Sequence, residues 1–556
     1  MVHATPTVKG KVQNETKRLP LKRFMPFLVF GSCLFYLSLT YDYGLNMKDE
    51  GYLLAGVIRI LEGQIPHIDF FQNYSPGRFY LFAAVFKFFG ADLLLIRKFW
   101  VCLIALSAVL AFALTIRIAP LWAALIPPVL LTVVPFPIYG SFFIFIPLLN
   151  LYLNALYFEN KISAFWFGFV TGLTILFRQD VGFIGVVVGL TAIAIRNKIT
   201  LENQASNMNK KNSIIRGGAE FCTGIASALL PLFYYYWSHS GLTELFSQIL
   251  FGGLQTNRGI PLPFPDIRLI IRHLFNFSAL HLLIVFYAPF LIYALSLGIM
   301  IKSFLTKRMD KPPVIYAMIL LTGLLILPQS FIRSDFSHMS QVLPPFFLLL
   351  AYWIHYFIRV VRKKSIILFG RIVSLTISFV LIGAALYVCI YHTFLYYNER
   401  SPFFTKFSRR FIYFTLENPR ARVRLLPHDK IVVNSIVQMI SEHTGKEDYL
   451  LCMPYDSIFN FLTGLRNPTR YDIFFPGVMD GSKDQQDSII ESIKHPKLKY
   501  IIFDDRPPDD MENRRMKYYI PDLYNYILRH FELEKTIGPY SILRRREEPH
   551  LLKQRE

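Results

Sequence analysis

The sequence lacks the cysteine spacings and the glycine-rich loops that mark many cofactor sites. Four of its five cysteines lie inside apolar runs and Cys452 stands alone outside them, so neither a metal site nor a disulfide pair is predicted. No inverted repeat of the transporter type and no low-complexity segment is present. No glycine-rich phosphate loop accompanies the strand-like segments of the carboxyl-terminal tail.

A continuous basic stripe is also missing, although the formal net charge is +21. The lysines and arginines are scattered over short loops between apolar runs and over the tail. A nucleic-acid-binding surface would gather these charges on one face or along one helix, so no nucleic-acid partner is predicted. We interpret the basic residues instead as signals of membrane topology.

Apolar residues, by contrast, are more abundant than a soluble core can contain. Hydrophobic residues make up 53% of the 556 positions, aromatic residues make up 16%, and the mean hydropathy is positive. The lipid bilayer must be the solvent for most of the chain, which predicts an all-α polytopic membrane protein. With ~20 residues per crossing, about eleven transmembrane helices are expected. They fall over 24–40, 93–116, 121–138, 140–158, 162–177, 181–196, 217–237, 278–301, 312–330, 342–361 and 367–391.

The distribution of positive charge predicts the orientation of these spans. The first run follows a basic stretch and has no small-residue cleavage site after it, so we expect an uncleaved signal-anchor with a cytoplasmic amino end. The loops rich in Lys and Arg then all become cytoplasmic, provided that Phe79–Gly90 is an interfacial helix that does not cross. These loops are 198–216, 302–311 and 362–364. The tail after Tyr397 is then extracytoplasmic, in the periplasm or in a lumen, and of these a bacterial inner membrane with a periplasmic tail is the expected location.

Three regions follow from this pattern: a cytoplasmic basic amino terminus over 1–23, a transmembrane domain over 24–396 with an outward loop at 41–77, and a soluble extracytoplasmic domain over 397–556. The last region has no spanning run. Its short apolar pieces and its helical spacing predict a small α/β unit. The strand candidates are Tyr449–Met453, Lys499–Phe503 and Tyr540–Leu543, and the helix candidates are Asp487–Ile493 and Asp522–Phe531.

Four polar clusters interrupt the apolar chain, and under this topology each faces outward. The first includes Asp42, Asp49-Glu50, Asp69 and Arg78 within the outward loop and its end. The others are Arg178-Gln179-Asp180, the loop around Arg258, and the segment from Arg333 to His338. Their common side predicts a functional site at the outer membrane surface.

The first cluster resembles the amino-terminal third of the GT-C glycosyltransferases, above all the branch of protein mannosyltransferases and lipid A aminoarabinose transferases with its bacterial relatives. The residues that carry the resemblance are Asp49-Glu50-Gly51-Tyr52, Gly63, Pro66, Asp69-Phe70-Phe71, Pro76-Gly77 and an apolar helix closing on Phe89-Gly90. Three later segments are also similar to family features. They are Arg178–Gly182, Arg333–His338 and Thr463–Tyr471.

The resemblance implies an enzyme that takes a sugar from a polyprenyl-phosphate carrier and attaches it to an extracytoplasmic acceptor, which is a glycan, a lipid or a protein. Relatives often carry an acid and then a base just before the Pro-Gly pair, whereas this chain has Gln72-Asn73. That departure weakens the expectation of a metal site built from two carboxylates.

Glycosyl transfer needs a base that takes the proton of the acceptor hydroxyl, and Asp49 is the predicted base because it follows the first span on the outer side. Transfer would then be inverting, without a covalent intermediate. Glu50 points away from Asp49 on either a helix or a strand, so it is predicted to support the site or to bind a divalent metal ion together with Asp49. The alternative is that both are ordinary acidic residues in the first turn of a helix.

A phosphate-linked donor also needs cations, and Arg178 and Arg333 are the candidates because each ends an apolar run on the outer side. Their alternative role is that of a charge which snorkels to the membrane surface, or of a salt bridge to Asp180 or to Asp335. His338 is a candidate for positioning the acceptor or binding a divalent ion, although an isolated histidine is more often only hydrogen-bonded. Asp69 and Asp335 complete the predicted substrate-binding set, and a turn residue is the alternative for Asp69.

Two other functions remain compatible with the sequence. A lipid or solute transporter would place ionisable or Gly/Pro-broken segments at the bilayer midplane, whereas the charges here cluster at one face. A ligase or polymerase of the O-antigen type would use outward Arg and His residues with a diphosphate-linked donor, and it would not need Asp49. A catalytically silent scaffold is a further possibility.

Overall fold

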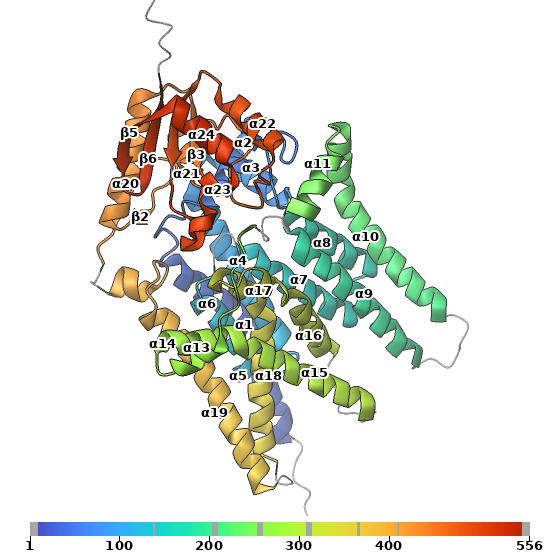
Figure 1. Ribbon diagram of the computed structural model, residues 1–556. Helices are drawn as coiled ribbons and strands as arrows, with labels where there is room; N and C mark the ends of the chain where they lie inside the picture. Colours follow the sequence, from blue (N-terminus) through green and yellow to red (C-terminus); the bar gives the residue numbers. More distant parts are fainter. Residues whose placement is uncertain are drawn as a thin grey trace, which may run out of the picture.

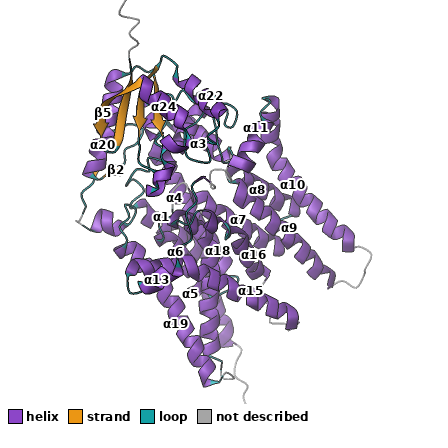
Figure 2. Cartoon of the chain, in the orientation of Figure 1, coloured by secondary structure: helices purple, strands orange, loops and turns teal. Residues whose placement is uncertain are grey.

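The protein is a helical membrane body with an α/β domain packed against one end (Figure 1). The computed structural model describes residues 9–136, 140–202, 210–252, 259–306, 314–363, 367–408 and 411–546. All described strands lie in the carboxyl-terminal region, and the rest of the described chain is helices and loops (Figure 2).

Helices follow one another through the membrane body. In chain order they are α1 (Lys9–Ser38), α2 (Asp49–Leu61), α3 (Gly77–Phe89), α4 (Leu93–Thr115), α5 (Leu121–Ala124), α6 (Ile126–Val133), α7 (Ser141–Phe158), α8 (Ala164–Phe177), α9 (Gln179–Glu202), α10 (Lys210–Ser238), α11 (Leu242–Ser247), η2 (Gln248–Gly252), α13 (Ile267–Arg272), α14 (Phe277–Leu282), η3 (Leu283–Tyr287), α15 (Ala288–Thr306), α16 (Val314–Ile326), α17 (Gln329–Ile332), α18 (Phe336–Val361), α19 (Leu368–Ile390), η4 (Tyr391–Leu395) and η5 (Phe403–Phe407).

Seven helical stretches within the described residues are long and apolar enough to cross a membrane: Leu93–Thr115, Ser141–Phe158, Gln179–Lys198, Phe277–Ser303, Val314–Ile332, Phe336–Val361 and Leu368–Leu395. Three further expected spans correspond to shorter apolar helices, Arg23–Ser38, Leu121–Val133 and Ala164–Phe177. The second of these is divided into α5 and α6, with Pro127 and Pro128 in the first turn of α6. The expected run 217–237 lies in α10, which begins in a basic segment.

Helix α3 covers most of the segment Phe79–Gly90, which the charge pattern predicts to be interfacial and not to cross the membrane. It has 13 residues, which at 1.5 Å per residue span only ~20 Å and fall short of a hydrocarbon core of ~30 Å. The helix ends at Gly90, whose φ of +86° is a left-handed value that favours glycine. Helix α3 packs against α2 instead.

The carboxyl-terminal domain has a four-stranded sheet in the order β3-β4-β6-β5. Its strands are β3 (Tyr449–Met453), β4 (Leu498–Phe503), β5 (Phe531–Ile537) and β6 (Tyr540–Arg545), and a separate pair is formed by β1 (Phe414–Thr415) and β2 (Arg424–Leu425). Strands β3 and β4 pair in parallel, whereas β6 is antiparallel to both β4 and β5. The helical elements are α20 (Pro427–His443), α21 (Ile458–Thr463), α22 (Lys483–Ile493), η6 (Pro508–Asp510), η7 (Glu512–Arg514), α23 (Met516–Tyr519) and α24 (Pro521–His530).

The predicted small α/β unit is confirmed, and the three predicted strands correspond to β3, β4 and β6. Strand β5 was not predicted, and its segment was partly assigned to the end of a helix. Its five central residues are exposed and only its end residues are buried, so it lacks the alternation that marks a half-buried strand. It is an edge strand, held by pairing with β6.

Helix α2 ties this domain to the membrane body. Arg59 binds Asp472 with an N–O distance of 2.9 Å and donates to the Thr469 carbonyl at 2.8 Å, and the Asn467 side chain also binds Asp472. A Cβ added at Gly51 would lie 2.5 Å from the Ile458 backbone nitrogen, closer than such contacts allow. Gly51 of the first motif and the Thr463–Tyr471 segment therefore lie in one interface, where α2 packs closely against the carboxyl-terminal domain.

Candidate functional site

A cavity of about 600 Å³ lies where the membrane helices meet the carboxyl-terminal domain. Its wall on the helix side includes the apolar residues Phe143, Phe183, Ile249, Leu250 and Ile332. Its polar lining includes Lys48, Asp49, Asn73, Arg178, Gln179, Asp180, Gln329, Arg333, Asp335, Ser337, His338, Gln341, Tyr455 and Asp509. Residues from three of the four polar clusters therefore line one cavity, although only Asp49 of the acidic and basic residues named in the first cluster does so. Arg258, from the remaining cluster, lies outside the described residues.

Asp49 is the first residue of α2 and borders this cavity. Its Oδ1 accepts a hydrogen bond of 2.8 Å from the Tyr455 hydroxyl, and its Oδ2 accepts one of 3.1 Å from the Asn46 side chain. The Asn46 Oδ1 in turn accepts from the backbone N–H of Lys48 and Asp49 and so caps the helix start. The carboxylate is fixed from both sides at a helix N-terminus, where the helix dipole favours negative charge.

Tyr455 is the partner that orients Asp49. Burial, followed by the negative charge of Asp49, raises the pKa of Tyr455 well above its ordinary value. The hydroxyl therefore keeps its proton at neutral pH and stays a donor to the carboxylate. It comes from the loop after β3, 406 positions away in sequence.

Glu50 lies on the other side of the helix and does not line the cavity. Its two oxygens accept from Arg97 on α4 at 2.8 and 2.7 Å, and both side chains are 1% exposed. The remaining Arg97 donors bind three backbone carbonyls of the preceding loop, those of Tyr41, Tyr43 and Gly44. Glu50 thus supports the segment that carries Asp49.

The expected metal site formed by Asp49 and Glu50 does not fit these contacts. Both Glu50 oxygens are engaged by Arg97, and the two carboxylates diverge, as their adjacent positions predict. Among the residues that the structure describes, no group of three or more His, Cys, Asp or Glu side chains is arranged to hold a metal ion.

Arg178 follows α8 and faces the cavity from the membrane side. Its guanidinium binds Asp180 at 2.8 and 3.1 Å and lies over the rings of Tyr74 and Phe143, with 4.2 and 3.3 Å to the ring centroids. Asp180 also accepts from Gln329. Arg178 forms the salt bridge and also borders the cavity. Its position is therefore compatible both with a structural salt bridge and with binding of the donor phosphate.

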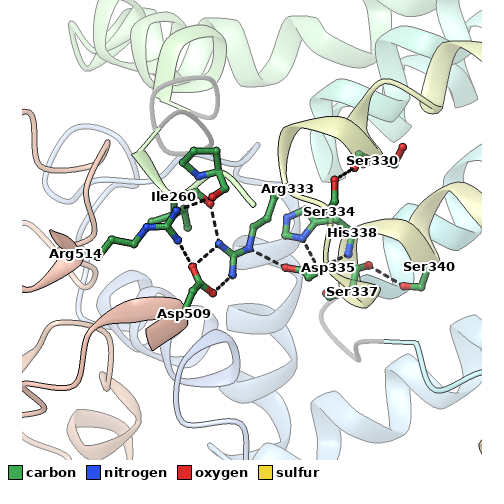
Figure 3. Close-up of polar contacts among 11 residues, drawn as sticks. Ile260, Ser330, Arg333, Ser334, Asp335, Ser337, His338, Ser340, Asp509 and Arg514 are labelled. Carbon is green, nitrogen blue, oxygen red and sulfur yellow. Dashed lines mark hydrogen bonds and ion pairs between the residues drawn. The ribbon is translucent and has the colours of Figure 1, made fainter. Parts of the chain in front are cut away.

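Arg333 joins the membrane helices to the carboxyl-terminal domain (Figure 3). Its Nε donates to Asp335 at 2.7 Å, while its terminal nitrogens bind the Ile260 carbonyl and Asp509. Asp335 caps α18 by accepting from the His338 backbone N–H, and it also contacts the His338 ring at 2.8 Å. Burial opposes ionisation of Asp335, but the His338 and Arg333 contacts outweigh it and lower its pKa.

Asp69 is placed apart from these residues. It is exposed, accepts from the Ile65 backbone at 2.6 Å and does not line the cavity, as expected for the turn alternative. Asn73, by contrast, does line the cavity, and its side-chain oxygen accepts a hydrogen bond of 3.3 Å from the Tyr52 hydroxyl.

Sequence reasoning missed Tyr455, Asp509 and Arg97 as parts of the site or its support. Arg97 carried a usable signal, because an arginine near the start of an apolar span needs a partner. Tyr455 and Asp509 belong to the tail domain, and no periodicity connects them to the outward loop.

No family model matches the sequence, and no curated protein sequence matches it. Among solved structures, ArnT from Cupriavidus metallidurans bound to undecaprenyl phosphate is similar over 95% of this chain and 98% of its own, with 12% identity and a TM-score of 0.49. AglB from Archaeoglobus fulgidus, an oligosaccharyltransferase in complex with an inhibitory peptide and a dolichol-phosphate, is similar over 94% of this chain and 74% of its own, with 12% identity and a TM-score of 0.48.

Proposed function

We propose that this protein is a GT-C-type glycosyltransferase that moves a sugar from a polyprenyl-phosphate carrier to an extracytoplasmic acceptor. One observation carries the proposal: an oriented carboxylate, two arginines and an apolar wall border a single cavity of about 600 Å³ beside the membrane helices. An isoprenoid phosphate sugar needs these three surfaces together. The lipid needs the apolar wall, the phosphate needs cations, and the reacting hydroxyl needs a base.

Asp49 is the proposed base. Its carboxylate takes the proton of the acceptor hydroxyl while the acceptor oxygen forms a bond to the anomeric carbon. The bond from that carbon to the phosphate oxygen breaks, and the phosphate leaves with the electron pair. A single base suffices for such a displacement, which inverts the anomeric configuration.

Tyr455 and Asn46 fix the direction of the Asp49 carboxylate. Glu50 acts indirectly, because its ion pair with Arg97 holds the loop before α2 in place.

Arg178 and Arg333 are proposed to neutralise the charge of the leaving phosphate. Arginine binds phosphate through a planar fork, and the attraction strengthens when water is excluded. Arg178 is held by Asp180 and two aromatic rings, so it is preorganised on the membrane side. His338 and Asp335 form the adjoining wall and are proposed to position substrate.

The cavity is proposed to open on the extracytoplasmic side of a bacterial inner membrane. The basic ends of α9, α10, α15 and α18 lie away from the carboxyl-terminal domain (Figure 1), and basic ends favour the cytoplasm. The amino terminus is then cytoplasmic, and the carboxyl-terminal domain is outside.

Comparing cell-envelope glycans with and without this protein tests the proposal in its native setting. Mass spectrometry of envelope glycans, lipids and glycoproteins should show one sugar substituent that disappears when the gene is deleted and returns with the wild-type chain. Identical spectra from both strains, under conditions where the protein is present, would contradict a glycosyltransferase function.

A further inference from the structure

Two arginines from different parts of the chain converge on the carboxylate of Asp509 (Figure 3). Arg333 follows α17 in the membrane body, and Arg514 ends η7 in the carboxyl-terminal domain. Arg333 approaches both Asp509 oxygens through its terminal nitrogens, one of them at 2.9 Å, and Arg514 binds one of the same oxygens. A single carboxylate therefore occupies a clamp of two guanidinium groups.

Other contacts hold the two arginines in place. Arg333 donates to the Ile260 carbonyl at 2.8 Å and to Asp335 at 2.7 Å, and Arg514 donates to the Pro261 carbonyl at 2.6 Å. The Arg333 and Arg514 side chains are only 15% and 7% exposed. Because these partners lie outside Asp509, the clamp is expected to persist when the carboxylate moves away.

The segment that carries Asp509 is held in an unfavourable backbone conformation. Asp509 and Asp510 have φ values of +58° and +55°, a left-handed region that residues with a side chain seldom adopt twice in succession. Pro508 and Asp509 also line the catalytic cavity. The loop thus carries backbone strain at the point where it contacts the two arginines, and a ligand in the cavity would meet it there.

We propose that Arg333 and Arg514 form a binding site for the phosphate of the lipid-linked donor, and that Asp509 is an internal anion which the phosphate displaces. The proposal rests on the proposed function and adds to it a second phosphate-binding residue, Arg514, together with a competing carboxylate. Phosphate offers more acceptor oxygens and more negative charge than a carboxylate, so it can replace Asp509 between the two guanidinium groups. Breaking the contact between Asp509 and the two arginines costs free energy, which lowers the apparent affinity for the donor.

Asp509→Asn tests the competition in the full-length protein. Asparagine tolerates left-handed backbone and has nearly the same shape, but it removes the charge. We expect farnesyl phosphate to bind about tenfold more tightly to this variant in nanodiscs, because a binding-competent clamp becomes more populated. Farnesol, which lacks the phosphate, should bind both proteins equally.

Asp510→Asn is the matched control, because it removes the same charge from the next residue, which forms no ion pair with a residue in the described chain. The proposal is overturned if the two variants behave alike, or if Asp509→Asn changes thermal stability without a phosphate-specific gain in affinity. Inorganic phosphate separates the possible sources of the anion. It should compete only weakly, and binding as tight as that of farnesyl phosphate would contradict a lipid-linked ligand.

Arg514→Gln provides an independent arm that remains informative if Asp509→Asn does not fold. Loss of this cation should weaken farnesyl phosphate binding about tenfold, the effect of one lost charge-assisted contact, and unchanged binding would overturn the assignment. These binding measurements do not require sugar transfer. If Asp509→Asn binds farnesyl phosphate more tightly but no sugar donor supports transfer, the clamp is upheld and the glycosyltransferase function is refuted. If sugar is transferred but the variants do not alter farnesyl phosphate binding, the function is upheld and the clamp is refuted.

Discussion

The ion pair between Glu50 and Arg97 gives a prediction that separates structural support from direct catalysis. Both side chains are 1% exposed, and Arg97 makes two hydrogen bonds to Glu50 and three to backbone carbonyls. Glu50→Gln keeps the shape of the side chain but leaves the Arg97 charge without its counter-ion. Removing one partner of a buried pair typically costs about 3–5 kcal/mol.

We therefore expect Glu50→Gln to lower the thermal unfolding midpoint of the detergent-purified protein by several degrees. Activity should also fall, because the segment that carries Asp49 loses its support. Glu159→Gln is the matched control. It also removes an arginine partner, Arg117, but Glu159 is 33% exposed, so the cost should be below about 1 kcal/mol. A Glu50→Gln protein that is as stable as wild type but inactive would refute this reasoning and favour direct contact with substrate or metal.

Three further outcomes can be measured separately. Arg178→Gln should raise the KM for the lipid-phosphate donor with near-normal expression, since one charge-assisted contact contributes on the order of 1.5–3 kcal/mol; loss of folded protein would instead favour a purely structural salt bridge. Burial, with the charge of Asp504, raises the pKa of Asp456 to about 6. The protonated Asp456 should therefore stabilise the fold fully at a pH below its unfolded pKa of about 4. This stabilisation, about 3 kcal/mol, should be lost as the pH rises through about 6. Asp456→Asn should abolish this part of the pH dependence of thermal unfolding, and an unchanged profile would contradict it. A reporter fused after Arg362 should be cytoplasmic and one fused after Asn398 extracytoplasmic, and a cytoplasmic tail would contradict the shared outer face.

The sequence predicted those features that depend on neighbouring residues. The apolar runs, the strands β3, β4 and β6, and the short helix α3 each follow from local composition or length. The same patterns could not show that Glu50 faces Arg97, because that pairing depends on how α2 crosses α4.

Contacts between the membrane helices and the carboxyl-terminal domain could not be predicted from the sequence either. The hydrogen bond from Tyr455 to Asp49 spans 406 positions, and the ion pair from Arg333 to Asp509 spans 176. Such pairs arise only when the carboxyl-terminal domain packs on the helices. Gly51 is part of the first motif, but the sequence does not show why a glycine is needed there. The reason is the close approach of Ile458, which lies in the same interface.

Replacing Asp49 tests the proposed chemistry most directly. Asp49→Asn keeps the size of the side chain but removes the proton acceptor, so sugar transfer from a polyprenyl-phosphate donor by the purified protein should slow by about 10²–10⁴. Asp69→Asn, in the same outward loop but away from the cavity, should transfer at nearly the wild-type rate. A correctly folded Asp49→Asn protein with wild-type turnover would contradict the assignment of Asp49 as the catalytic base.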